Sequence, residues 1–310
     1  MKDLLVLGAG PAGVAASIYG VRAGMDLAVL ERLSPGGQVM NTWEVENYPG
    51  FPEPIAGWEL MSRMEDQARR LGVVFESGDV VSFQRRDDGV FALALGDGRV
   101  MESKAVIAAT GAGYRKLGVP GEKEHIGRGV SYCATCDGAF FKGKVTAVVG
   151  GGNTALEEAF FLTRFASKVY LIHRRDRYRA DDIIQKRVMS SAVIEPVLNT
   201  TVCCVNGGAK VESITVMDRE TGRESDLSVD GVFVFVGVDL NTAYLPADLL
   251  NEKGEVRVDA RMRTAVPGLF AAGDLRSDSK RQIVMACADG ATAAMEAYDY
   301  LIENAAASAK

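Results

Sequence analysis

The feature that most constrains this chain is a glycine pattern that occurs twice, each time between a predicted strand and a predicted helix. The first copy follows the apolar run 4–7 and reads Gly8-Ala9-Gly10-Pro11-Ala12-Gly13. Residues 14–24 are mostly small or apolar and favour a helix directly after it. This is G-x-G-x-x-G in its required context, in which glycines let the backbone approach a pyrophosphate at the helix N-terminus. The first copy therefore predicts a dinucleotide site in a Rossmann-like α/β fold.

An acidic residue indicates which kind of dinucleotide binds at this first site. Residues 27–30 predict a second strand that ends in Glu31, 18 residues past Gly13. A carboxylate at this place accepts hydrogen bonds from an adenosine ribose and repels a 2′-phosphate. The alternative is a glycine-rich turn followed by a chance acid. We expect a dinucleotide without a 2′-phosphate, and FAD fits.

The second copy follows a predicted strand at 144–149. It reads Gly150-Gly151-Gly152-Asn153-Thr154-Ala155, with alanine in the third glycine position, and a helical segment and the strand 168–172 come next. Here the strand ends in His173-Arg174-Arg175, and Arg179 lies four residues further on. In isolation these arginines would indicate a solvated basic turn, but at the expected ribose position they suit a dianionic 2′-phosphate. The second site is therefore predicted to bind NADPH.

Two cysteines, Cys133 and Cys136, lie between the glycine patterns. A zinc site would need two more ligands, and no second pair has metal-ligand spacing. A permanent disulfide across so short a loop would contribute little stability. Both sulfurs can instead lie on the first turn of a helix, where the helix dipole and a second close thiol lower one thiol pKa. The pattern therefore predicts a redox couple.

The acid after the pair, Asp137, can pass a proton when a thiolate becomes a thiol, although it can also be a helix-cap residue. Cys203, Cys204 and Cys287 are interpreted as buried or incidental. The late run 269–272 predicts a strand closed by Gly273 and Asp274, followed by an alanine-rich helix from about residue 281 or 282. That helix start can favour negative charge on a reduced flavin, or the helix can simply pack.

Composition excludes several classes of protein. A length of 310 residues allows two domains, and 35 basic against 41 acidic residues give a net charge of −6. This balance does not support a nucleic-acid or anionic-membrane partner. Residues 1–16 superficially resemble a signal peptide, but Asp3 and the glycine break argue against one, and no stretch approaches ~18 apolar residues. Five cysteines do not form a disulfide scaffold, so we expect a reducing cytoplasm. We also expect no metal, because no further ligands have metal-site spacing.

Several short stretches together carry a family resemblance: GAGPAG, GGQ with EVENYPG, ATGA, CATCDG, GGGNTALEEA, HRRDRYRA, and GLFAAGD with RQ. With them the chain resembles the bacterial-type, low-molecular-weight thioredoxin reductases over nearly its whole length. CATCDG between the two glycine patterns is the most specific of these. The longer glutathione-reductase group has its dithiol in the flavin domain with a wider spacing, and ferredoxin–NADP reductase relatives lack the dithiol.

The resemblance implies a homodimeric enzyme that reduces the disulfide of thioredoxin, or of a thioredoxin-like protein, with NADPH and FAD. Its FAD-binding domain would be discontinuous, 1–113 and 244–310, and the NADPH-binding domain, 114–243, would carry the dithiol. The segments TGAGYRK and VDLNTA would be hinges. One domain would rotate against the other, because the dithiol and the nicotinamide cannot cover the same flavin face together.

The same resemblance implies roles for single residues. Cys136 would face the flavin, Cys133 would attack the thioredoxin disulfide, and Asp137 would donate the proton. The residues implied to bind FAD are Gly8, Gly10, Pro11, Ala12, Gly13, Glu31, Gly36, Gly37, Gln38, Asn47, Thr110, Gly111, Gly273, Asp274, Arg281, Gln282 and Ile283. The residues implied to bind NADPH are Gly150, Gly152, Asn153, Thr154, His173, Arg174, Arg175 and Arg179.

The chain also departs from the family pattern. FVGVDLN stands where the family usually has isoleucine-glycine-histidine followed by proline-asparagine, so Val238 and Asp239 are unusual. Lys280 stands where a tyrosine is common, and ACADGA replaces a more glycine-rich helix turn. Two other functions are considered. A dithiol oxidase would pass electrons to oxygen, but such relatives usually lose the nucleotide arginines. A non-catalytic nucleotide-sensing or partner-binding module would have no need of the dithiol.

Overall fold

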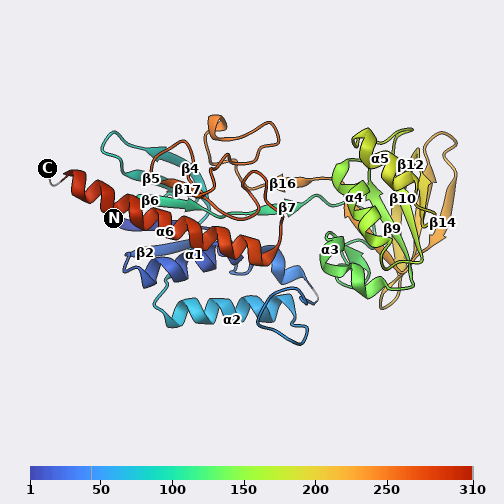
Figure 1. The fold of residues 1–310 in the computed structure, drawn as a ribbon, viewed down its shortest axis with the longest axis horizontal. Coiled ribbons are helices and arrows are strands. Elements are labelled where there is room, and N and C mark those ends of the chain that lie inside the picture. Colours follow the sequence, from blue (N-terminus) through green and yellow to red (C-terminus); the bar gives the residue numbers. More distant parts are fainter. Residues whose placement is uncertain (43, 309–310) are drawn as a thin grey trace. The chain divides into compact units, whose positions relative to one another are not determined.

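The computed structural model describes residues 1–42 and 44–308. The chain divides into two compact units. The first comprises Met1–Thr42, Tyr48–Gly113 and Leu240–Lys310, and the second comprises Trp43–Asn47 and Tyr114–Asp239. Each unit is built around a largely parallel sheet with a glycine loop at a strand end, which confirms the predicted α/β fold class (Figure 1).

The sheet of the first unit has the order β3-β2-β1-β6-β5-β4, with β17 also paired to β6. The strands β3, β2, β1, β6 and β17 are parallel, whereas β5 and β4 form an antiparallel extension. Leu4 to Leu7 are at most 1% exposed, because a parallel strand is covered on both faces. The bounds are β1 (Lys2–Leu7), β2 (Leu27–Glu31), β3 (Phe75–Ser77), β4 (Val80–Arg85), β5 (Phe91–Leu95), β6 (Val100–Ala108) and β17 (Leu269–Ala271).

Helices α1 (Pro11–Arg22) and α6 (Ile283–Ser308) lie side by side against this sheet (Figure 1). Their backbones approach closely, because a Cβ at Gly290 would overlap the carbonyl oxygen of Ala12. The alanine-rich sequence of α6 is therefore explained by packing, whatever its first turn also contacts. The remaining helical segments are α2 (Gly57–Arg70) and the 3-10 turns η1 (Gly37–Asn41) and η3 (Ala247–Leu249).

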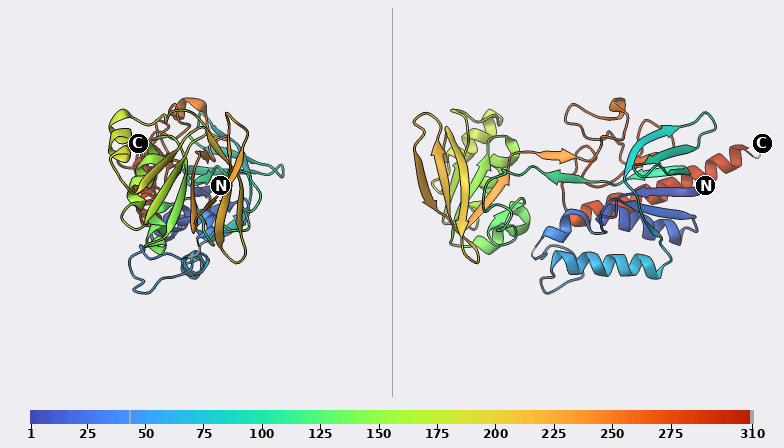
Figure 2. Two further views of the ribbon diagram at one scale, coloured as in Figure 1. Left: turned by 90° about the vertical axis from the view of Figure 1, so that its right-hand side faces the viewer. Right: turned by 180° about the vertical axis from the view of Figure 1, so that it is seen from behind.

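The second unit has a parallel sheet of order β11-β10-β9-β15-β8 and an antiparallel sheet of order β12-β13-β14 (Figure 2). Apolar side chains from both sheets form one core cluster, in which Val149 and Val232 meet Val202 and Ile214. The bounds are β8 (Val130–Ser131), β9 (Val145–Gly150), β10 (Lys168–Ile172), β11 (Ile194–Val197), β12 (Thr200–Gly207), β13 (Val211–Asp218), β14 (Glu224–Ser228) and β15 (Gly231–Phe235). The helical segments are α3 (Ala134–Asp137), η2 (Gly138–Phe141), α4 (Asn153–Leu162) and α5 (Asp182–Met189).

The two connecting segments pair with each other. Strand β7 (Ala112–Tyr114) and strand β16 (Val238–Leu240) form a two-stranded sheet. The backbone N–H of Arg115 donates to the carbonyl of Gly237 at 3.0 Å, and the Arg115 guanidinium forms an ion pair with Asp239. Asp239, one of the departures from the family pattern, therefore has a partner on the other connector.

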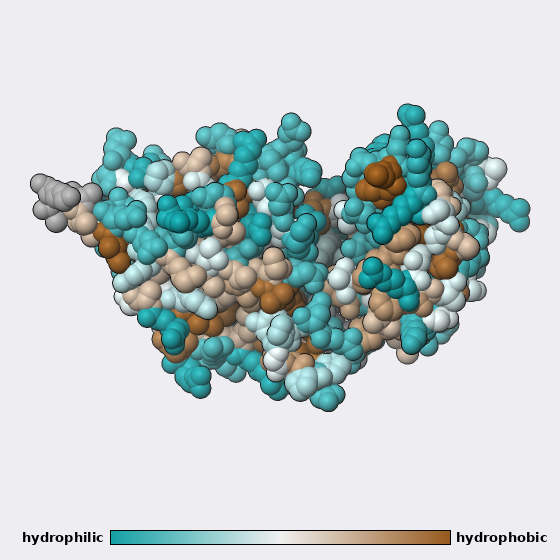
Figure 3. Space-filling view, in the orientation of Figure 1, coloured by the Kyte–Doolittle hydropathy of each residue, from teal (hydrophilic) through white to brown (hydrophobic). Residues whose placement is uncertain are grey.

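Within the described part of the chain, none of the helices has both the length and the apolar character needed to cross a bilayer. The face shown in Figure 3 is mainly hydrophilic, with small separate apolar patches.

Candidate active site

The first glycine loop is shaped by contacts within the protein and leaves one open position. A Cβ at Gly8, where φ is +98°, would overlap Ala109, and a Cβ at Gly13 would overlap the carbonyl oxygen of Gly8. Gly10 is different, because a Cβ there would meet nothing within 4 Å. Gly10 is also the N-cap of α1 and has no side chain to satisfy the free N–H groups of the first turn. The loop therefore fits a phosphate at this helix start.

Glu31, at the end of β2, supports this loop. Its Oε2 accepts a hydrogen bond from the backbone N–H of Ala9 at 2.8 Å, and its Oε1 accepts one from Leu33 at 2.9 Å. Carboxylate oxygens can accept further hydrogen bonds, so the predicted ribose contact is compatible with this geometry. The carboxylate thus also fixes the glycine loop, which the sequence pattern did not indicate.

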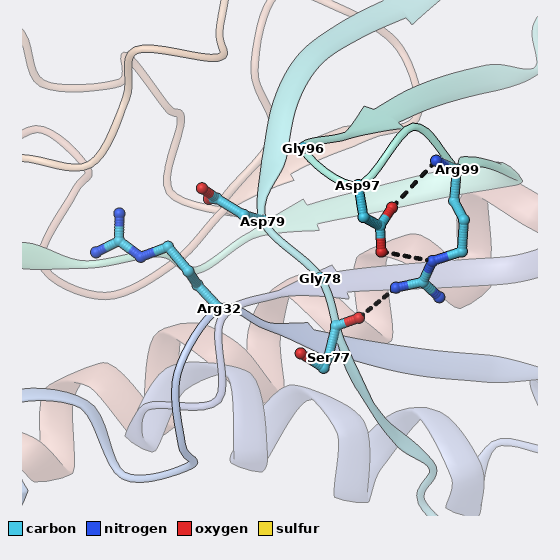
Figure 4. A pocket seen from close by; sticks show the side chains of 7 residues that line it. All are labelled: Arg32, Ser77, Gly78, Asp79, Gly96, Asp97 and Arg99. Atoms are coloured by element: carbon cyan, nitrogen blue, oxygen red, sulfur yellow. Dashed lines mark hydrogen bonds and ion pairs between the residues drawn. The ribbon is translucent and has the colours of Figure 1, made fainter.

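An open pocket of about 490 Å³ lies directly beyond this strand end. Figure 4 shows Arg32 extended along it without a bond to the other residues drawn, whereas Arg99 is held by Asp97 and the carbonyl of Ser77. The lining residues are Arg32, Ser77, Gly78, Asp79, Gly96, Asp97 and Arg99. Its position next to Glu31 fits the adenosine end of a dinucleotide.

The residues after β17 form a charged cluster at the start of α6. Asp274 accepts a hydrogen bond from Ser279 at 3.3 Å; burial raises the pKa of Asp274, and the nearby charge of Arg281 opposes that rise. The Nε of Arg281 is buried and has no hydrogen-bond partner among the described residues. An unpartnered guanidinium nitrogen is costly, so this place fits an acceptor group from a ligand.

A buried ion pair braces the same segment. Arg276 donates to both carboxylate oxygens of Asp289, at 2.6 and 2.9 Å, and the N–H of Gly273 donates to Asp289 at 3.2 Å. Asp289 belongs to α6, so the pair ties the end of β17 to that helix. This pairing was not predicted, because a charge pair 13 residues apart leaves no local pattern.

The other predicted flavin residues of the loops are placed as follows. Gly36 donates a backbone hydrogen bond to Ala9 at 2.9 Å, which brings the GGQ segment to the first glycine loop. Thr110 donates to the carbonyl of Asn241 at 2.7 Å. Gln38 is exposed, and Asn47, also exposed, groups with the second unit rather than with the first.

The second glycine loop repeats the geometry of the first. Gly150 and Gly151 are closed in, by Phe235 and Ala155 in one case and by the ring of His173 in the other. At Gly152, the N-cap of α4, a Cβ would again meet nothing within 4 Å. Asn153 exchanges hydrogen bonds with Asp181 at 2.8 and 2.9 Å, and the N–H of Arg179 donates to Gly151 at 2.7 Å. The loop and the arginine segment are therefore one hydrogen-bonded structure.

The side chains of Arg174, Arg175 and Arg179 are all exposed on this segment. His173 is buried beneath Gly151 and stacks on Tyr178 with ring centroids 5.5 Å apart. Burial lowers the pKa of His173, and the three arginines lower it further. The histidine is therefore a neutral support of the loop, while the arginines are free to meet an anion.

The dithiol lies at a helix start, as predicted. Cys133 and Cys136 form a disulfide. Cys133 is the N-cap of α3, and its Sγ accepts a hydrogen bond from the N–H of Cys136 at 3.2 Å. Both residues are partly exposed. A helix N-terminus stabilises a thiolate, so the arrangement suits reversible opening of the disulfide.

Ser131 connects this pair to Asp137. Its hydroxyl donates to Asp137 Oδ2 at 2.6 Å and accepts from the backbone N–H of Cys133 at 3.1 Å. Burial raises the pKa of Asp137, and the Ser131 hydrogen bond opposes that rise. Asp137 is the last residue of α3 and the N-cap position of η2, where its side chain makes no capping hydrogen bond. It is instead a partly buried carboxyl group suited to holding a proton near the sulfurs.

A second carboxyl group, that of Glu158 in α4, contacts the first turn of α3. Burial raises the pKa of Glu158, and hydrogen bonds from the backbone N–H groups of Ala134 and Thr135 oppose the rise. These N–H groups belong to the first turn of the cysteine helix. Neither Ser131 nor Glu158 was found from the sequence, because both act through the fold rather than through spacing.

Comparison with known proteins decides the family. The model of the pyridine nucleotide-disulphide oxidoreductase family matches residues 2–290. A thioredoxin reductase of Bacillus subtilis is 45% identical over 303 residues, which cover 97% of this chain and 95% of that protein. The chain belongs to the thioredoxin reductase family. A thioredoxin reductase of Listeria innocua matches equally well, at 45% identity over 97% of this chain and 94% of that protein.

A solved thioredoxin reductase structure agrees. The crystal structure from Streptococcus pyogenes has a TM-score of 0.94 at 40% identity and covers 98% of this chain and 99% of that one. The resemblance noted in the sequence is therefore confirmed, as is the oxidoreductase class of this thioredoxin reductase family member. The roles of its individual site residues stay predictions.

Proposed function

We propose that this chain reduces the disulfide of thioredoxin, or of a thioredoxin-like protein, with electrons from NADPH. The observation that carries the proposal is the Cys133–Cys136 disulfide at the start of α3, with the partly buried carboxyl group of Asp137 joined to it through Ser131. A merely structural disulfide would need neither a helix start nor an adjacent proton-holding group. The two nucleotide loops complete the requirements of such an enzyme.

Thioredoxin reductases of this family use FAD and NADPH. On this chain the first glycine loop with Glu31, the GGQ segment, Thr110 and the cluster around Asp274 and Arg281 would hold FAD. The open space at Gly10 and the unpartnered Nε of Arg281 support this fit. When bound, the flavin supplies the transfer of an electron pair from the nicotinamide to the cysteine pair.

The second loop would hold NADPH. Its open N-cap at Gly152 suits the pyrophosphate, and Arg174, Arg175 and Arg179 suit the 2′-phosphate that distinguishes NADPH from NADH. His173 stays neutral beneath the loop and fixes its backbone.

Once reduced, the pair exchanges with the acceptor in two steps. The Cys133 thiolate attacks one sulfur of the thioredoxin disulfide, so that a mixed disulfide forms and the other thioredoxin sulfur leaves, taking its proton from Asp137. The Cys136 thiolate then attacks Cys133 Sγ. The mixed disulfide breaks, the second thioredoxin sulfur leaves as a thiolate that takes a proton from water, and the Cys133–Cys136 disulfide is restored.

Three further features follow from the family resemblance and are part of the proposal: alternation between two domain orientations during turnover, a homodimer, and a cytoplasmic location. A covalent link between the two units should stop turnover without loss of flavin. Normal steady-state rates in a linked enzyme would contradict the domain rotation. A molecular mass equal to that of a single chain in sedimentation equilibrium would contradict the homodimer.

The decisive experiment uses Cys136→Ser. The variant should still bleach its flavin when mixed with NADPH but should show no disulfide reduction, because the exchange needs both sulfurs. Stopped-flow absorbance with NADPH alone, followed by addition of oxidised thioredoxin, separates the two steps. A matched Cys287→Ser variant should retain activity. Thioredoxin reduction by Cys136→Ser at the wild-type rate would refute the proposed relay.

A further inference from the structure

The vicinal cysteines of β12 are placed by an irregularity in the sheet. Val202 pairs with Val216, and the next pair is Cys204 with Thr215, so Cys203 is an extra residue without a partner in the ladder. This is a β-bulge in a strand at the edge of the β12-β13-β14 sheet. A bulge changes the direction in which the following side chains point.

The bulge brings both thiols to one face of the sheet. In a regular strand, consecutive side chains point to opposite faces. Here Val202 and Val205 are buried in the core cluster of the second unit, whereas Cys203 and Cys204 between them are both partly exposed. The normal alternation is therefore interrupted at these two cysteines, and their thiols share the face that points away from the core.

Both sulfurs are available on this face. They are not joined in a disulfide, and their hydrogen bonds are long contacts to carbonyls, 4.0 Å to Thr201 for Cys203 and 3.7 Å to Val205 for Cys204. Met217 also belongs to the outward-facing set of β13 and pairs with Thr201, two residues before the bulge residue. Two thiols and a thioether thus lie along one face of adjacent strands.

We propose that Cys203 and Cys204 form a second dithiol site, which binds a thiophilic ion of the soft class, either a trivalent arsenical or monovalent copper. Soft sulfur ligands select such ions over the harder divalent metals. With an arsenic(III) oxide group, two S–As bonds form, the As–O bond breaks, and the two thiol protons leave with the oxygen as water. No oxidant or reductant is needed. The site is independent of the proposed reductase function.

Adjacency of the two thiols should give the site its affinity. Once one thiolate has bound, the second binds within the same molecule, and such linkage raises overall affinity by roughly 10²–10⁴ without any new contact. A lone cysteine such as Cys287 lacks this advantage. The structure therefore predicts a large difference between the pair and either cysteine alone.

The test uses the full chain with Cys133, Cys136 and Cys287 replaced by serine, which leaves only the pair because the sequence has five cysteines. Bound FAD and an unchanged melting temperature show that this variant is folded. One equivalent of phenylarsine oxide should protect both thiols from alkylation, as counted by mass spectrometry. Adding Cys203→Ser or Cys204→Ser should weaken binding about 100-fold. Protection of one thiol only, or single-cysteine variants as tight as the pair, would overturn the site.

A second experiment distinguishes monovalent copper from the arsenical as the ligand. Monovalent copper should compete with phenylarsine oxide for the pair, and Met217→Leu should weaken copper binding while leaving arsenical binding unchanged, because only copper uses a thioether. Failure of copper to compete would overturn the copper part of the proposal. In the wild-type protein with its Cys133–Cys136 disulfide intact, the arsenical should lower the number of titratable thiols from three to one.

Discussion

The two glycine loops use the same backbone design and differ in charge. In each loop, two glycines are enclosed by the protein, whereas the N-cap glycine, Gly10 or Gly152, faces open space. After the first loop the next strand ends in Glu31, which is hydrogen-bonded to the loop itself. After the second, the strand leads to three exposed arginines above a buried histidine. The shared part binds a pyrophosphate, and the part that differs selects which dinucleotide each unit can hold.

The third glycine position separates the loops most strongly. Gly13→Ala should cost at least ~3 kcal/mol of stability, because its Cβ would overlap the carbonyl oxygen of Gly8. The matched change Ala155→Gly should cost only about 1 kcal/mol, the usual helix penalty of glycine. Thermal unfolding and flavin content measure both. If the two substitutions lowered the melting temperature equally, the proposed difference in packing between the two loops would be wrong.

How much of this site could be predicted from sequence depends on whether its signal is local. The glycine loops, the end of β2 at Glu31 and the start of α6 at Ile283 follow from apolar runs and turn residues that are neighbours in the chain. The Ser131–Asp137 contact, the Glu158 support of α3 and the Arg276–Asp289 pair join different elements, so no spacing indicates them. The bulge at Cys203 was missed for the same reason, since it exists only relative to β13.

The arginine cluster should account for the nucleotide preference. Arg174→Ala combined with Arg175→Ala should weaken NADPH binding by roughly 2–5 kcal/mol, because each charged hydrogen-bonding group contributes about 1.5–3 kcal/mol and the two are not additive. Binding of NADH should change little. Steady-state KM values for both nucleotides provide the measurement, and Arg177→Ala, an exposed arginine of the same segment, is the control. An unchanged preference for NADPH would exclude the cluster as its source.

The open glycines test the shared part of the two loops. Gly10→Ala and Gly152→Ala should lower the melting temperature only slightly, by the small N-cap preference of glycine over alanine. Apart from the neighbouring residues in the chain, no protein atom lies within 4 Å of either new Cβ. Each should weaken its own dinucleotide by about 5- to 150-fold, as expected for ~1–3 kcal/mol of overpacking against the ligand. Each variant is the control for the other when FAD and NADPH affinities are titrated separately. A loss of both ligands in one variant would mean that the loops are not independent.

The smallest expected effect concerns pH and belongs to the second loop alone. The pKa of His173 is lowered in the folded protein, first by burial and then by the three arginines, so the unfolded chain binds a proton at its ordinary value of 6.5 while the folded chain does not. Stability therefore falls as the pH drops below about 6.5, and it is fully present above that value. His173→Gln should remove this part of the pH dependence, while Arg174→Ala with Arg175→Ala should reduce it by letting the folded-state pKa rise. Melting temperatures between pH 5 and 8 measure the difference. Since the first loop has no corresponding histidine, flavin release should not follow the same pH profile, and a common profile would place the titrating group elsewhere.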